Sequence, residues 1–427
     1  MRFVLFLVTL VLSVSLARAD GRLVVGNEFA LLENGPGQGL QARPVAAYGK
    51  DVYLVVWREG WHGLGGKARI YAARVDKAGR VLDPKGIEVS PSREGVQEAP
   101  RVAFGGGVFL IVWHDLRNGK DYDVLAARIL PEGKVLDSEP IEIAASPRNQ
   151  VLPDVASDGK GFLVAWQGAV EEMHSWKVPQ VVFHKFVRPV SSSGALGTAV
   201  NLGRGPQPRL AWDGRSYLIA YGDGATYVAR LNSKGQPLTG QTGMLIGPEF
   251  SKAGVFSVAG ADGKGWVIVT HRSPPDYWGW GGPGSIRAYL VLPDGTIDPS
   301  LKPHIDRDKA GNWAKLPNWL DLGGRQAKTW PHGESAVAWD GKQFVAVWQR
   351  HHLEAKVEFV NTDIFASRLD GWRPLNEAGV AVAASVEEEK NPALASDGAG
   401  GLLCVYEKHG TDGKVRVVGR LMGTRAE

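Results

Sequence analysis

The chain has 427 residues, of which 44% are hydrophobic and 22% are charged, and this balance excludes an intrinsically disordered protein. Its formal net charge of +4 is too small for nucleic-acid binding driven by overall charge. Glycine and proline are abundant, with 55 and 25 residues, and this favours a fold rich in turns over a helical one.

Residues 1–19 have the features of a secretory signal. Arg2 supplies the positive charge, residues 3–16 are apolar, and Ala17-Arg18-Ala19 matches a small-residue cleavage site. We therefore expect cleavage after Ala19, one domain over residues 20–427, and a secreted or periplasmic protein. No later segment has the length and hydrophobicity of a membrane-spanning helix, so no membrane span is expected.

One pattern then recurs seven times: a proline or small residue, V-A-x-D-G, and an apolar run that usually ends in Trp or Tyr. The copies occupy residues 43–57, 100–113, 153–166, 208–221, 256–270, 335–348 and 392–406. The apolar runs on each side of the glycine-containing turn predict two antiparallel strands, A and B. A third apolar segment, strand C, follows each copy, and in most repeats a second glycine turn and a strand D come next.

Each repeat therefore predicts a four-stranded antiparallel sheet. One such sheet cannot bury both of its faces alone, whereas sheets repeated around an axis bury each other, so we predict an all-β, seven-bladed β-propeller. The seventh repeat ends after strand C, near Leu421. Residues 22–33 precede the first strand A, and we expect them to supply the missing outer strand and close the last blade.

The repeats resemble those of seven-bladed β-propeller proteins secreted by bacteria, over nearly all of residues 22–422. They lack the S-x-D-x-G-x-T-W box of sialidases, the G-H…W-D signature of WD40 repeats and the clustered aspartates of FG-GAP repeats. The resemblance therefore implies the fold and no particular activity.

Cysteine and metal-binding motifs are sparse. Cys404 is the only cysteine, which excludes an internal disulfide, and its apolar neighbours predict a buried side chain. His351 and His352 are adjacent on an extended segment and point to opposite sides, so they do not chelate one ion together. No zinc or phosphate-binding motif occurs, and we expect no metal and no cofactor.

The connections between strands B and C and between D and A lie on one face of a propeller, and nearly all length variation falls there. Loops on a rigid scaffold carry function. Seven of the ten histidines fall in the B–C connections. The residues directly after each strand B form a polar ring by topology. From these two groups and the loop tryptophans we predict a ligand-binding set of Arg58, His114, Asp115, Asp223, Trp278, Trp280, His352, Lys408 and His409.

Structural roles are an alternative explanation for some of these polar and aromatic residues. The segment from Asp115 to Asp123 is also consistent with a hairpin held by its own ion pairs, notably those of Arg117 and Asp123. Its acidic residues lack the spacing of an EF-hand calcium loop. The tryptophans that end strand B, such as Trp57 and Trp113, are expected to be inter-blade core.

The longest interval between repeats, 78 residues from Thr270 to Trp348, contains the most aromatic connections. Its B–C loop spans residues 271–284, and its D–A link contains Trp313, Trp319 and Trp330. Exposed aromatic rings in glycine-rich loops suit stacking on sugar rings. The alternative is a loop that packs on itself and plugs the ring.

Three functions are therefore open. The first is an exported protein that binds a glycan or acidic polysaccharide on the B–C/D–A face. The second is an enzyme there, most plausibly a polysaccharide lyase, in which Arg272 and Arg350 neutralise a uronate while His271, His351 or Tyr277 transfers protons. A hydrolase with Asp115, Asp223 or Glu407 belongs to the same class. The third is a protein-interaction platform.

Overall fold

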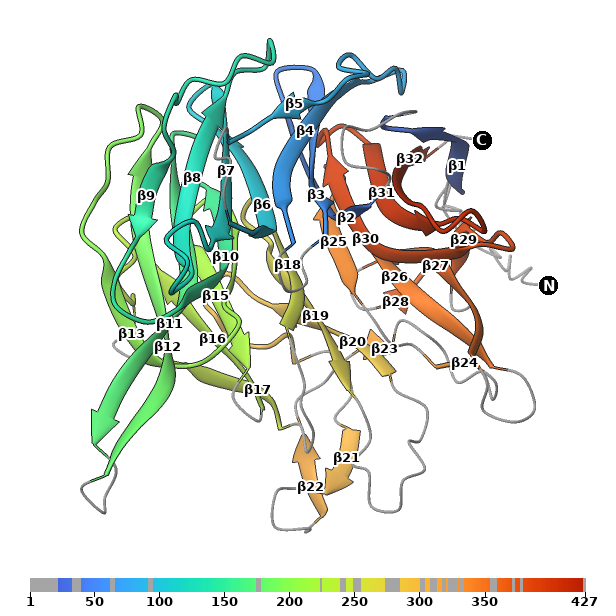
Figure 1. The fold of residues 1–427 in the computed structure, drawn as a ribbon. Coiled ribbons are helices and arrows are strands. Elements are labelled where there is room, and N and C mark those ends of the chain that lie inside the picture. Colours follow the sequence, from blue (N-terminus) through green and yellow to red (C-terminus); the bar gives the residue numbers. More distant parts are fainter. Residues whose placement is uncertain are drawn as a thin grey trace, which may run out of the picture.

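The computed structural model confirms an all-β propeller of seven antiparallel blades (Figure 1). It describes residues 22–32, 40–61, 66–90, 95–173, 178–222, 225–238, 243–248, 255–272, 285–299, 304–307, 313–316, 320–321, 329–330, 334–353, 359–370, 373–376 and 379–424. The predicted signal segment lies outside these residues.

Blades 1 to 4 follow the predicted strand order. Blade 1 contains β2 (Gln41–Gly49), β3 (Val52–Gly60), β4 (Ala68–Asp76) and β5 (Ile87–Glu88). Blade 2 contains β6 (Gln97–Gly105), β7 (Val108–Asp115), β8 (Asp123–Ile129) and β9 (Ile141–Ala144). Blade 3 contains β10 (Gln150–Ser157), β11 (Gly161–Met173), β12 (Pro179–Ser191) and β13 (Val200–Arg204). Blade 4 contains β14 (Arg209–Trp212), β15 (Tyr217–Gly222), β16 (Ala225–Leu231) and β17 (Met244–Pro248).

Blades 5 to 7 complete the ring. Blade 5 contains β18 (Val255–Ala261), β19 (Gly265–Arg272), β20 (Ser285–Val291) and β23 (Leu320–Asp321), and a separate hairpin is formed by β21 (His304–Arg307) and β22 (Trp313–Leu316). Blade 6 contains β25 (Ser335–Trp339), β26 (Phe344–Leu353), β27 (Phe359–Asp370) and β29 (Val380–Ala383), with β24 (Thr329–Trp330) and β28 (Arg373–Pro374) added at its ends. Blade 7 contains β30 (Glu388–Ser396), β31 (Gly401–His409), β32 (Val415–Thr424) and the N-terminal β1 (Leu23–Ala30).

The N-terminal segment closes the last blade, as predicted. Strand β1 runs antiparallel to β32, from the pair Leu23–Thr424 to the pair Ala30–Val418. Glu28 adds an ionic contact, since its carboxylate accepts hydrogen bonds from the Tyr406 hydroxyl at 2.6 Å and the Lys408 ammonium at 2.7 Å. We call β1 and the residues that Glu28 contacts the latch.

The hydrophobic core of the described chain consists of seven clusters, and each lies at one junction between neighbouring blades. The tryptophans that end strand B belong to these clusters, as expected: Trp57, Trp113 and Trp348 are fully buried, and Trp166 is 3% exposed. Cys404 is buried in the cluster between blades 6 and 7, and burial raises the pKa of its thiol to about 12. Every blade therefore depends on two neighbours for its buried faces.

On the face of the A–B and C–D turns, an arginine of strand C links each of three blades to the next. Arg74, Arg128 and Arg230 donate to the carbonyl groups of Pro131, Ser192 and Asp294 in the following blade, at 3.0–3.1 Å. The facing turn needs glycine because Gly133 has a φ of +90° and a Cβ there would lie 2.8 Å from the Arg74 Nε. The arginine that recurs after an alanine in strand C therefore links neighbouring blades.

Two connections differ from prediction. Strands β11 and β12 continue past the expected end of strand B and pair as far as Met173 and Pro179, so most of the predicted B–C loop of blade 3 is a projecting hairpin (Figure 1). The hairpin of β21 and β22 precedes β23, the fourth strand of blade 5, whereas we predicted that the insertion follows this strand. Within the described chain, no helix has the length and hydropathy needed to cross a bilayer.

The latch should make unfolding sensitive to acid. Burial raises the pKa of Glu28, but the hydrogen bonds from Lys408 and Tyr406 outweigh it and hold this pKa below 4.5. A carboxylate with a depressed pKa stabilises the fold above its unfolded-state pKa and loses this effect as the pH falls through the folded-state value. We predict that Glu28→Gln lowers the free energy of unfolding at pH 7 by about 1–3 kcal/mol and weakens its decline between pH 5 and 3, as measured by urea denaturation. Exposed Glu139 provides the control, Glu139→Gln, and equal behaviour of the two variants would contradict the latch.

Candidate functional site

Five blades have the same backbone irregularity in the innermost strand or, in blade 4, just before it. A non-glycine residue with positive φ stands directly before a proline at Arg43, Ala99, Leu152, Gln207 and Asn391, with φ between +49° and +56°. In four of these blades the register of strands A and B shifts at this point, which is the mark of a β-bulge. The left-handed conformation is unfavourable for such residues and persists only where neighbouring contacts hold it.

The neighbouring blade supplies such a contact. The polar residue directly after the recurring Trp or Tyr of the second strand accepts a hydrogen bond from the N–H of the left-handed residue in the next blade. The backbone N–H groups of Arg43, Leu152, Gln207 and Asn391 donate to the side chains of Glu407 at 2.7 Å, His114 at 3.3 Å, Gln167 at 3.0 Å and Gln349 at 3.2 Å, respectively. We call this contact the clasp. Burial lowers the pKa of His114 to about 4, so its ring is neutral at pH 7 and its Nδ1 can accept.

One equivalent side chain per blade lines the central channel, and in the five blades with a left-handed residue it comes two residues after that residue. By strand register these residues are equivalent, because each pairs with the residue before the last aromatic or Thr of strand B. They are Val45, Arg101, Asp154, Arg209, Ser257, Ala336 and Ala393. The next position along each strand is aliphatic in all seven blades. At these seven positions, the charged side chains come from blades 2, 3 and 4.

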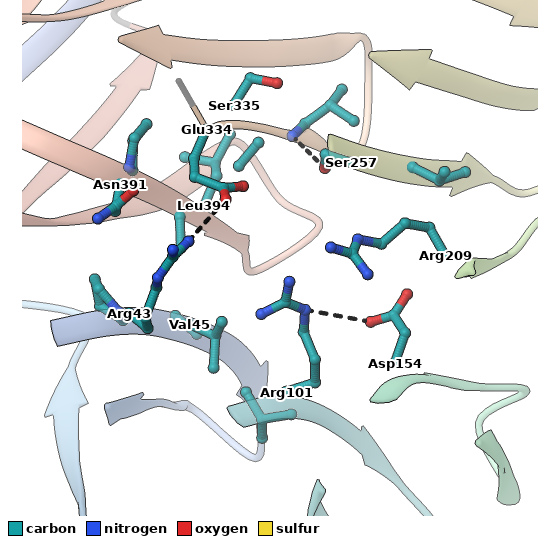
Figure 2. Close-up of a pocket in the computed structure, with 18 of the residues that line it drawn as sticks. Arg43, Val45, Arg101, Asp154, Arg209, Ser257, Glu334, Ser335, Asn391 and Leu394 are labelled. Atoms are coloured by element: carbon teal, nitrogen blue, oxygen red, sulfur yellow. Dashed lines mark hydrogen bonds and ion pairs between the residues drawn. The ribbon is translucent and has the colours of Figure 1, made fainter. Parts of the chain in front are cut away.

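These strands surround a cavity of about 210 Å³, the channel pocket, which all seven blades line (Figure 2). Arg101 and Arg209 point toward the same region of it, and Arg101 Nε lies 3.6 Å from Asp154 Oδ1. Across the pocket, Arg43 Nη1 donates to Glu334 Oε1 at 2.8 Å. Asp154 also accepts the N–H of Leu210 at 2.7 Å, which joins blade 3 to blade 4.

The charges of the pocket are unbalanced. Its described lining contains three arginines, Arg43, Arg101 and Arg209, but only two carboxylates, Asp154 and Glu334. Burial and then repulsion from Arg209 lower the pKa of Arg101 to about 10, which still leaves it charged at pH 7. Two cations held this close in a concave site favour an anion between them.

Several residues predicted to bind ligand make structural contacts in the described chain. Asp115 is buried and accepts hydrogen bonds from the Trp113 indole at 3.0 Å and from Arg117 at 2.7 Å. The contact of Arg117 with Asp115 is an ion pair within the predicted hairpin, whereas Asp123 accepts a hydrogen bond from Asn118. His114 takes part in a clasp.

Three more predicted residues lie at blade 7 or blade 6. Lys408 belongs to the latch, and His409 Nε2 lies 3.1 Å from Glu407 Oε2. Arg350 is 5% exposed, and its guanidinium carbon lies 3.7 Å from the centre of the Phe365 ring. Arg58 is buried at the junction of blades 1 and 2.

The remaining predicted residues cannot be placed. The backbone of His271 and Arg272 ends β19, and that of His351 and His352 lies in β26, but their side chains are outside the described part of the chain. Asp223, Tyr277, Trp278 and Trp280 lie outside it entirely. Their roles stay predictions. The described residues contain no group of three or more potential metal ligands.

The sequence-based prediction of the site did not include Arg101 and Arg209, because it considered the loops and the residues that follow strand B. A sequence signal was present, since Arg101, Asp154 and Arg209 stand directly after a proline at a position where other repeats have Val, Ser or Ala. A charged residue on the innermost strand of a propeller has little space to occupy except the channel.

The clasp yields a stability prediction. Gln167→Ala removes the acceptor from the Gln207 N–H, in a contact that is partly buried, and should lower the free energy of unfolding by about 0.5–1.5 kcal/mol. Gln167→Glu keeps an acceptor, as Glu407 does in blade 7, and should keep most of the stability. Urea denaturation at pH 7 measures both, and equal losses for the two variants would show that the hydrogen bond is unimportant.

No protein-family model matches the sequence, and no curated protein sequence matches it. Solved structures do match. The ectodomain of the parainfluenza virus 5 hemagglutinin-neuraminidase has a TM-score of 0.52 at 10% identity, and the match covers 95% of this chain and 86% of that one. A puromycin-hydrolysing peptidase of Mycobacterium tuberculosis has a TM-score of 0.50 at 12% identity, covering 90% of this chain and 53% of that one. The sialidase of Trypanosoma rangeli has a TM-score of 0.45 at 9% identity, covering 89% and 54%. At these identities the likeness concerns the propeller fold alone.

Proposed function

We propose that this chain is an exported binding protein for an acidic glycan, whose carboxylate enters the channel pocket. The single observation that carries the proposal is the convergence of Arg101 and Arg209 on one cavity (Figure 2). Guanidinium groups present planar pairs of N–H donors that match a carboxylate, and such charge-assisted bonds are among the strongest in recognition. The excess of arginines over carboxylates supplies the attraction.

The opposite wall of the pocket supports a hydroxylated ligand over a simple anion. Glu334 and Asn391 offer oxygen acceptors there, and Ser335 has a buried hydroxyl without a hydrogen-bond partner among the described residues. Sugar hydroxyls both donate and accept, so they can satisfy this mixed set of groups while the carboxylate contacts the arginines.

The size of the pocket limits what enters it. Sites for drug-sized ligands are roughly 300–1,000 Å³, and the channel pocket, at about 210 Å³, is smaller. One acidic sugar unit at most is expected inside it. The rest of a longer glycan would lie on the B–C/D–A face, where the predicted aromatic loops emerge.

Binding has more support than the two alternatives. A lyase needs an accessible arginine beside its proton-transfer groups. Of the two candidates, Arg350 is buried against Phe365, and the side chain of Arg272 lies outside the described part of the chain. A protein-interaction platform does not require converging polar side chains inside a cavity. The viral propeller with a similar fold belongs to a protein named for a neuraminidase, which makes glycans a sensible first class to screen.

The test compares each uronate with its neutral sugar. We predict that D-galacturonate or D-glucuronate binds in calorimetry at low ionic strength, whereas D-galactose and D-glucose do not. The double variant Arg101→Gln/Arg209→Gln should lose about tenfold or more in affinity, and added salt should weaken binding by the unsubstituted protein.

The matched control is Arg80→Gln, which removes an exposed arginine from a C–D turn on the opposite face and should bind normally. Circular dichroism checks that every variant is folded. If no acidic sugar or acidic polysaccharide binds, or if the double variant binds as well as the unsubstituted protein, the proposal is wrong.

A further inference from the structure

Five junctions have a left-handed residue before a proline, and the one without a clasp points to a second site. In blades 2, 3, 6 and 7 the residue after the Trp or Tyr of the second strand is a hydrogen-bond acceptor for the next blade. In blade 1 the equivalent residue is Arg58, which pairs with Ala42 as Glu407 pairs with Lys390. A guanidinium has five donors and no acceptor, so it cannot form a clasp.

The residue that Arg58 faces has the same geometry as its counterparts. Ala99 has a φ of +49° and precedes Pro100, and the register of β6 and β7 shifts between Glu98 and Arg101. By equivalence with the other junctions, the Ala99 N–H points toward the position that Arg58 occupies. Two donors therefore meet where the other junctions have a donor and an acceptor.

Arg58 itself is incompletely satisfied. It is 9% exposed, and its Nε is buried without a hydrogen-bond partner in the part of the chain that the structure describes. Its contact with the Glu98 carboxylate is long, at 3.7 Å between Nη1 and Oε2. Burial lowers the pKa of Arg58 and outweighs the carboxylates of Glu98 and Glu407, which raise it, while the positive charge of Arg43 adds a smaller lowering effect. A buried guanidinium N–H without an acceptor is energetically unfavourable.

Local rules of a fold are most often broken where function requires it. What the junction lacks is an oxygen that accepts from both Arg58 and Ala99. We propose that the junction of blades 1 and 2 is an oxyanion subsite, in which Arg58 Nε–H and the Ala99 N–H bind one carboxylate or sulfate group. Arg43, which lines the channel pocket, adds positive charge beside it.

The subsite is distinct from the Arg101 and Arg209 pair, and it binds a simple oxyanion whatever the ligand of the channel pocket is. Its larger use rests on the proposed function: in a glycan with acidic groups on neighbouring units, one group would enter the channel pocket and the next would reach Arg58. The chain would then select polyanionic glycans over singly charged ones.

The decisive variant is Arg58→Gln, because glutamine completes clasps at the same position in blades 3 and 6. In chloride buffer this variant should be more stable than the unsubstituted protein, with a Tm higher by about 2–4 °C. Added sulfate, at ionic strength matched with chloride, should raise the Tm of the unsubstituted protein and of Arg80→Gln more than that of Arg58→Gln. A lower Tm for Arg58→Gln together with an unchanged sulfate response would overturn the subsite.

A second variant keeps the test open if Arg58→Gln does not fold. Glu98→Gln removes the carboxylate that competes for the guanidinium and should strengthen sulfate binding several-fold, measured as a lower midpoint of the sulfate titration. An unchanged or weaker response would count against the subsite.

Digalacturonate and galacturonate separate the two proposals and the two sources of the oxyanion. With both correct, Arg58→Gln weakens digalacturonate binding and leaves galacturonate binding unchanged, whereas Arg101→Gln/Arg209→Gln weakens both. A third outcome is that Arg58→Gln loses sulfate binding while no variant binds a uronate. The ligand of the subsite would then be a free inorganic anion, and only the proposed function would be wrong. Equal digalacturonate affinity of Arg58→Gln and the unsubstituted protein would refute the glycan-borne role of the subsite while leaving the channel pocket intact.

Discussion

The structure depends on burial between blades. Each sheet has two apolar faces, and the seven hydrophobic clusters show that each face is buried only against the next sheet. An open array would leave two faces exposed, so closure of the ring is required for the stability of every blade. The latch matters for this reason. Leu31 and Leu32, which directly follow β1, are almost fully buried at the junction of blades 7 and 1.

The polar contacts at the junctions differ between the two faces. On the face of the A–B and C–D turns, arginines of strand C donate hydrogen bonds to carbonyls of the next blade. On the B–C/D–A face, clasps stabilise residues whose left-handed backbone conformation is unfavourable. Each bulge turns the start of strand A so that the following side chains face the channel. The candidate site is thus a consequence of how the blades are joined, and no loop is needed to build its described part.

The repeats allowed much of the fold to be predicted. Strand alternation and turn glycines recur in every copy, and the fully buried tryptophans and the N-terminal closing strand follow from the same pattern. The insertion of blade 5 was placed on the wrong side of its fourth strand because β23 has only two residues, too few to show a periodic pattern. The long hairpin of blade 3 was missed because Glu171, Glu172 and Gln180 give it the composition of a loop.

The site was harder to predict, for a physical reason. Polar residues after strand B were expected to face a ligand, but His114, Gln167 and Glu407 satisfy backbone N–H groups of a neighbouring blade. Sequence shows that a residue is polar and does not show which donor it meets across a junction far away in the chain. Conversely, Arg101 and Arg209 belong to strands that read as core, and only the radial arrangement shows that their inner edges line a channel.

Strand β1 also has a consequence for the way the chain reaches its folded state. Leu23 pairs with Thr424, and Glu28 contacts Lys408, which is 380 residues away. Strand β1 is synthesised first and can pair only after β32 has been synthesised, so the ring closes last. Contacts between residues so far apart in sequence slow folding. Because the first and last described strands pair in one sheet, a short linker could join them, and new ends could be opened in the connection between two other blades. Such a permuted chain would have all seven blades continuous in sequence, and comparing its refolding rate with that of the natural order would measure how much time closure takes.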